Sequence, residues 1–129
     1  MKLETQAVTI QKSKDDVFNL LSDLKNFKQL MPDNIQKFEV DGESFLFALP
    51  GMPEIRLVLK EKKPTESIVL GAASSKLDFT LLVDLKELSE KTTTAQLFFD
   101  GKFNPMMAML VKKPLTNFIN TLSVNLQKS

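Results

Sequence analysis

The spacing of apolar residues divides the chain into a short helical section, a long β section and a C-terminal helix. Residues 2–11 alternate weakly between apolar and polar side chains, which predicts a first strand. Helical spacing begins at Val17, behind Ser13, a residue type that commonly caps helix N-termini. A second short helix follows over residues 24–31, and Pro32 ends it. Two short helices are therefore expected after one strand.

After the second helix the period changes to two, and turn-forming residues separate six apolar segments. The clearest alternation places Leu77, Phe79, Leu81 and Val83 on one face of a strand, with Leu82 as the apolar exception on the other. Because the connections are short, the strands should be sequential antiparallel neighbours. The predicted strands cover residues 35–40, 43–49, 55–62, 66–73, 77–88 and 92–103, with turns that include Asp41–Gly42 and Ser74–Ser75.

The C-terminal segment predicts the longest helix of the chain. Asn104 is a plausible N-cap and Pro105 a suitable first helical residue. Apolar residues then recur at three- and four-residue steps to about Leu126. Pro114 lies inside this pattern and removes one backbone donor. Since the apolar stripe continues in phase beyond it, we expect a bend at Pro114 and not a stop.

Composition limits the classes of function. The chain has 129 residues, 43% of them hydrophobic and 26% charged, with a formal net charge of +1, which predicts one domain over residues 1–129. The balanced charge argues against nucleic-acid binding and against a polybasic membrane patch. Cysteine, histidine, tyrosine and tryptophan are all absent. The commonest metal ligands and the usual acid/base group at neutral pH are therefore missing.

The termini and the apolar runs bear on location. The first residues lack the continuous apolar core of a secretory signal. No run approaches the ~18 apolar residues that a membrane span needs. The sequence thus predicts a cytoplasmic protein without stable membrane insertion.

The charged residues offer no catalytic set. Asp15 and Asp16 form an acidic pair, but their place in a first helical turn explains them through the helix dipole. The strand phases place Asp78, Asp84 and Asp100 toward solvent, and the sole arginine, Arg56, on the outer face. The four glycines form no phosphate-binding motif. We therefore predict no catalytic residue, no metal site and no cofactor.

The order of elements resembles the helix-grip superfamily (SRPBCC). Residues 8–32, "VTIQKSKDDVFNLLSDLKNFKQLMP", are similar to the strand, capped helix and second helix that open its bacterial members. That superfamily includes START lipid-transfer domains, polyketide cyclase/dehydrase-like proteins and the birch-pollen allergen family. The resemblance implies an α+β fold: a seven-stranded curved antiparallel sheet wrapped around a long C-terminal helix, with two short helices between the first and second strands. It also implies a cavity between sheet and helix.

The candidate ligand-binding residues are the apolar side chains expected to face that cavity. Three methionines, Met106, Met107 and Met109, begin the long helix, and methionine adapts to irregular shapes. The same side chains are equally compatible with simple core packing. The predicted set is Met107, Val111, Leu115, Phe118 and Leu122 from the helix, with Phe47, Leu57, Phe79, Leu81 and Phe99 from the strands.

Three functions remain open at the level of sequence. The favoured one is binding of a small apolar ligand, such as a lipid, isoprenoid or polyketide-like molecule, without catalysis. The second is a cyclase- or dehydratase-like enzyme that acts on a hydrophobic substrate through a lone carboxylate or lysine. The third is a protein-interaction module with a filled core, and a protein partner or a homodimer is compatible with it.

Overall fold

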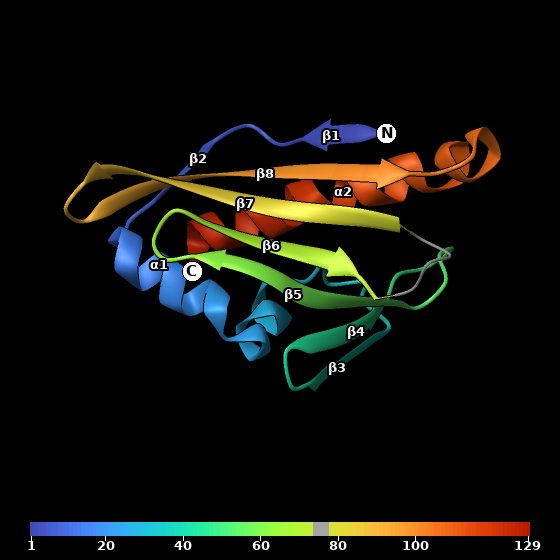
Figure 1. Cartoon of the computed structure of the whole chain (residues 1–129), viewed down its shortest axis with the longest axis horizontal. Helices are drawn as coiled ribbons and strands as arrows, with labels where there is room; N and C mark the ends of the chain where they lie inside the picture. The colour runs from blue at the N-terminus through green and yellow to red at the C-terminus, as the bar shows by residue number, and fades with distance from the viewer. Residues whose placement is uncertain (74–77) are drawn as a thin grey trace.

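The computed structural model describes residues 1–73 and 78–129, and a single antiparallel sheet organises them (Figure 1). The predicted Ser74–Ser75 turn and the predicted inward position of Leu77 lie outside the described residues. Along the chain the elements are β1 (Lys2–Glu4), β2 (Val8–Ile10), α1 (Lys14–Ser22), the 3₁₀ helix η1 (Leu24–Leu30), β3 (Lys37–Asp41), β4 (Ser44–Ala48), β5 (Ile55–Lys63), β6 (Ser67–Ala72), β7 (Asp78–Ser89), β8 (Thr92–Lys102) and α2 (Pro105–Lys128).

The sheet order confirms the predicted fold. The strand order is β1-β8-β7-β6-β5-β4-β3, and every pair is antiparallel. Strand β2 also pairs with β8, at residues 93–95, whereas β1 pairs with residues 98–100. The predicted first strand is divided into two, because Thr5 interrupts its ladder. Thr5 is buried and bonds to Leu97 twice, its backbone N–H to the Leu97 carbonyl at 3.0 Å and its Oγ1 to the Leu97 N–H at 3.1 Å. One strand thus becomes two short ones along the same partner.

Local capping defines both helices where the sequence predicted it. Ser13 Oγ accepts the Asp16 N–H at 3.2 Å, and Asn104 Oδ1 accepts the Met107 N–H at 2.8 Å. Helix α2 continues through Pro114, so the prediction that this proline does not stop the helix is confirmed. In Figure 1, α2 (red to orange) runs behind the sheet, and its first turns extend past the end of β8.

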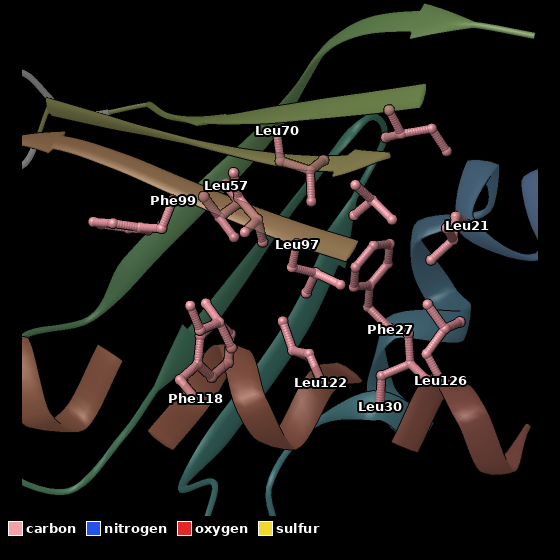
Figure 2. Packing of buried hydrophobic residues seen from close by; sticks show 14 of the residues in the cluster. Leu21, Phe27, Leu30, Leu57, Leu70, Leu97, Phe99, Phe118, Leu122 and Leu126 are labelled. Carbon is pink, nitrogen blue, oxygen red and sulfur yellow. The ribbon is translucent and has the colours of Figure 1, made fainter. Parts of the chain in front are cut away.

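The hydrophobic core lies between the sheet and the helices. Strand side chains at every second position are buried, and they meet apolar residues of α1, η1 and α2 in one cluster (Figure 2). A register shift between Leu59 and Glu61 interrupts the β5–β6 ladder. Such irregularities bend a strand, which helps the sheet to curve toward α2.

The opposite face of the sheet carries most of the polar strand residues. Asp78 and Asp100 are exposed, Asp84 is half-buried, and the guanidinium of Arg56 donates to Ser44 Oγ at 2.8 Å. The outward phase predicted for Arg56 is therefore correct. Leu82 lies directly opposite Phe98 on this face, which explains the apolar exception in the β7 pattern.

Candidate ligand-binding site

The structure brings the predicted ligand-binding residues together in one cluster. Nine of them are buried and Met107 is partly buried against the same core. Figure 2 shows Phe118 and Leu122 pointing from α2 toward Leu57 and Leu97 on the sheet. The inward residues are Val111, Leu115, Phe118 and Leu122 of α2, Phe47 of β4, Leu57 of β5, Phe79 and Leu81 of β7, and Phe99 of β8. Burial suits both a cavity lining and a filled core.

Aromatic contacts divide this interior into two ends. Phe47 and Phe118 stack with ring centroids 4.8 Å apart and planes within 6°. At the other end Phe79 and Phe99 lie 4.9 Å apart, and Phe103 joins them from the segment that leads into α2. Both groups are wholly hydrocarbon, so neither end offers a hydrogen bond to a ligand.

An open pocket lies where the first of these ends reaches the surface. Its volume is about 340 Å³, and Phe118 forms part of its wall. Helix α2 supplies one side of the pocket, and the segments after η1 and after β4 supply the other. The lining residues are Pro32, Asn34, Leu49, Pro50, Lys113, Pro114, Asn117, Phe118 and Thr121. The pocket is therefore continuous with the aromatic pair through one side chain.

The chemistry of the pocket differs from that of the interior. Lys113 contributes an ammonium group, Asn34 and Asn117 contribute amides, and Thr121 contributes a hydroxyl. No carboxylate is among the described lining residues, so they form no acid/base pair. The pocket can donate hydrogen bonds to a polar or anionic group while its inner wall offers Leu49 and Phe118 to an apolar one.

Most of the pocket lining was missed by sequence reasoning. Of its residues, Phe118 alone belonged to the predicted set, although Pro114 had been singled out for the helix bend. Residues 34, 49 and 50 lie in connections, and no periodic pattern predicts which connection meets the helix. The residues of α2 that line the pocket could have been predicted from their spacing along the helix. Asn117 and Thr121 share the helix face beside Pro114, one turn apart.

Pro114 sets the local geometry of this helix face. A proline at this position leaves the carbonyl of Leu110 without its usual N–H partner four residues later. The first turn of the helix is fixed separately by the Asn104 cap and by Pro105 at its start. The pocket thus lies against a turn of α2 that lacks one backbone hydrogen bond.

The methionines do not behave as one group. Met107 is partly buried against the core, as predicted. Met106 and Met109 are instead 75% and 83% exposed, and Leu110 is 66% exposed. Neither cavity lining nor core filling accounts for these three, which lie on the side of α2 that faces away from the sheet.

Electrostatics adds little to the interior. Among the described residues, no group of three or more histidine, cysteine, aspartate or glutamate side chains is placed to hold a metal ion. The pKa of Lys37 is raised, first by its hydrogen bond to Glu54 and then by the charge of Glu39. These side chains form ion pairs of 3.2 and 3.9 Å at the sheet edge. They stabilise an exposed charge, which is a structural role.

Solved structures match this architecture over nearly the whole chain. Norcoclaurine synthase from Thalictrum flavum, solved with dopamine and hydroxybenzaldehyde, superposes with a TM-score of 0.75 at 13% identity, covering 99% of this chain and 86% of that one. A START superfamily protein from Mycobacterium smegmatis gives 0.68 at 12% identity, covering 98% and 97%. A protein from Thermus thermophilus gives 0.73 at 14% identity, covering 99% and 95%.

The chain has the helix-grip fold. The resemblance stated from the sequence is therefore confirmed at the level of fold, including the open antiparallel sheet, the early short helices and the long C-terminal helix. No family model matches the chain, and no curated protein matches it by sequence. At identities of 12–14% the helix-grip likeness establishes architecture alone, so function must be argued from the site.

Proposed function

We propose that this helix-grip protein binds a small apolar ligand between the concave face of its sheet and α2, without catalysis. One observation carries the proposal: Phe118 belongs both to the wall of the open pocket and to the buried aromatic pair with Phe47. Rotation of that single side chain would join the pocket to the apolar interior. The pocket is then the access route, and the ten predicted residues line the bound molecule.

The lining defines the class of ligand. Leucine, valine and phenylalanine side chains would surround the ligand body, so binding would come from burial, at about 25 cal/mol per Å² of apolar area. The polar group of the ligand would lie at the mouth, beside Lys113 and Asn117. A molecule with an apolar chain or ring system and one polar or anionic end fits both regions.

Two further points support the proposal. The norcoclaurine synthase structure holds two small aromatic molecules in the same fold, so the fold accommodates small ligands. That protein is an enzyme by name, and catalysis here would require a reactive group at the cavity. The described pocket lining offers Lys113 as a reactive group but no carboxylate, and the chain has no histidine, so Lys113 has no acid/base partner there. Binding without turnover is therefore the function we favour, in a protein that we expect to be cytoplasmic.

Titration with a neutral apolar fluorophore, N-phenyl-1-naphthylamine, tests the proposal. We expect saturable binding at a single site with enhanced emission. Val111 is buried on the inner face of α2. A Val111→Phe variant would occupy the room that we propose for the ligand and should abolish binding. The matched control is Val69→Phe, which adds the same bulk on the outer face of the sheet and should leave binding unchanged.

Folding is checked separately, because an added ring in a packed core costs about 1–3 kcal/mol. Circular dichroism should show that both variants stay folded. If Val111→Phe unfolds, native mass spectrometry of the wild-type protein, purified without delipidation, replaces it. An adduct of constant mass supports the proposal, whereas the absence of both an adduct and saturable fluorophore binding overturns it and leaves a filled core.

A further inference from the structure

The first turns of α2 are apolar on nearly every side. Residues 106–111 read Met-Met-Ala-Met-Leu-Val. Met107 and Val111 face the core, whereas Met106, Met109 and Leu110 are 75%, 83% and 66% exposed. A helix that is apolar all round is normally covered on all sides. The sheet covers one side of this segment, and its other side faces solvent.

Two lysines border the exposed side chains. Lys112 is three residues from Met109, and Lys113 is three residues from Leu110, so both ammonium groups lie next to the apolar residues on the helix surface. We call Met106, Met109, Leu110, Lys112 and Lys113 the methionine–lysine patch. Figure 1 shows that the first turns of α2 extend past the end of β8. All five residues of the patch are exposed.

The C-terminal segment that contains the patch carries charged side chains of one sign. Residues 101–129 contain four lysines and neither aspartate nor glutamate. Lys102 lies opposite Asp78 across the strands, which compensates part of its charge, whereas Lys112 and Lys113 are exposed on the helix. The first turn of α2 also lacks acidic residues, so no negatively charged side chain offsets the positive end of its dipole. The patch is therefore both apolar and cationic.

We propose that the methionine–lysine patch docks on an anionic lipid bilayer. Methionine and leucine would insert at the boundary between headgroups and acyl chains, while the lysine ammonium groups stay at the level of the anionic headgroups. A second copy of the chain fits the patch less well. A two-fold contact would place Lys112 and Lys113 of one copy against the same lysines of the other, with no acidic residue of 101–129 to pair with them.

The position of the patch relates it to the pocket. Lys113 belongs to both, so a bilayer that covers the patch would lie beside the mouth at Pro114. Docking does not depend on a ligand inside the protein, and it does not require a membrane-spanning segment. Within the described residues, no helix has both the length and the apolar character needed to cross a bilayer.

Vesicle flotation tests the proposal. We expect the protein to float with phosphatidylcholine vesicles that contain about 30% phosphatidylserine, and to float less with phosphatidylcholine alone or at high salt. A Met106→Ser/Met109→Ser/Leu110→Ser variant should lose about tenfold or more in partitioning. A Lys112→Gln/Lys113→Gln variant should lose roughly fivefold per lysine.

Matched controls distinguish binding through the patch from nonspecific adsorption to vesicles. Leu88→Ser removes an apolar residue that is 62% exposed at the end of β7, and Lys62→Gln/Lys63→Gln removes two exposed neighbouring lysines of β5. Both control variants should float like the wild type. The patch variants alter exposed side chains, and circular dichroism should confirm that they fold. Equal losses in the patch and control variants would overturn the proposal.

A second readout avoids loss of function altogether. Because the chain has no tryptophan, Met109→Trp introduces a single reporter at the patch. Its emission should shift to shorter wavelength when phosphatidylserine vesicles are added, and that of Leu88→Trp should not. An unchanged Met109→Trp spectrum would show that the patch does not dock on the bilayer. A dimer in light scattering that the triple serine variant abolishes would show that the patch mediates self-association instead.

Discussion

The rings of Phe47 and Phe118 lie parallel, 4.8 Å apart, and join β4 to α2 beside the open pocket. Such pairs contribute about 0.5–1.5 kcal/mol beyond the area that they bury. We expect a double-mutant cycle of Phe47→Leu and Phe118→Leu to give a coupling free energy of that size in urea denaturation. Phe47→Leu and Phe79→Leu, on non-adjacent strands, should be additive. Additivity in the first pair would show that the stacked geometry contributes nothing.

Replacement of Pro114 by alanine should separate packing from access. Alanine restores an N–H for the Leu110 carbonyl, so the free energy of unfolding should rise, by at most about 3 kcal/mol. If this turn opens to admit a ligand, stopped-flow uptake of the naphthylamine fluorophore should also slow. Asn117→Ala, which alters the pocket without changing the backbone, is the control. Unchanged uptake in the folded alanine variant would limit Pro114 to packing.

Asn125 should stabilise the contact between α2 and η1. Its side-chain amide donates to the carbonyls of Leu30 at 2.9 Å and Met31 at 3.3 Å, where η1 ends. Asn125→Ala leaves those carbonyls without this donor and should lower the free energy of unfolding by about 1–3 kcal/mol. Asn120→Ala, at an exposed position of the same helix, should stay within about 0.5 kcal/mol of the wild type. Similar losses of unfolding free energy in Asn125→Ala and Asn120→Ala would contradict a specific role for Asn125.

Thr5→Val tests the division of the first strand. Valine keeps the shape of threonine but cannot accept the Leu97 N–H, which lies in a buried part of β8. We expect the free energy of unfolding of Thr5→Val, measured by heat or urea, to fall by about 1–3 kcal/mol. Thr9→Val, on the partly exposed β2, is the comparison. A neutral Thr5→Val variant would mean that water satisfies the Leu97 donor.

Stability and ligand binding should be independent of pH between about 5.5 and 7. The chain has no histidine, whose ordinary pKa of ~6.5 falls in this window. Lys37 has a raised pKa, so its ion pairs contribute fully below the ordinary value of 10.5 and are lost only as the pH rises beyond it. Thermal unfolding across the window checks this. A transition near pH 6.5 would reveal a strongly perturbed carboxylate.

The sequence predicted those features that depend on neighbouring residues. The caps at Ser13 and Asn104 and the alternation along β7 follow from spacing within one element, and the structure confirms them. The contact of Asn125 with Leu30 spans 95 residues, so no local pattern could indicate it. The inward set from Met107 to Leu122 was predictable because helical phase alone fixes it.

Pairing of β1 and β2 with β8 also has a consequence for the order of folding. Leu3 pairs with Phe99 and Val8 with Ala95, so the first strands meet a partner from the last strand of the sheet. During synthesis on the ribosome, these strands stay unpaired until β8 has left the exit tunnel. Contacts of such high sequence separation slow folding. The apolar faces of β4 to β7 lack their native cover until α2 has also been synthesised, and such exposed surface makes the nascent chain prone to aggregation.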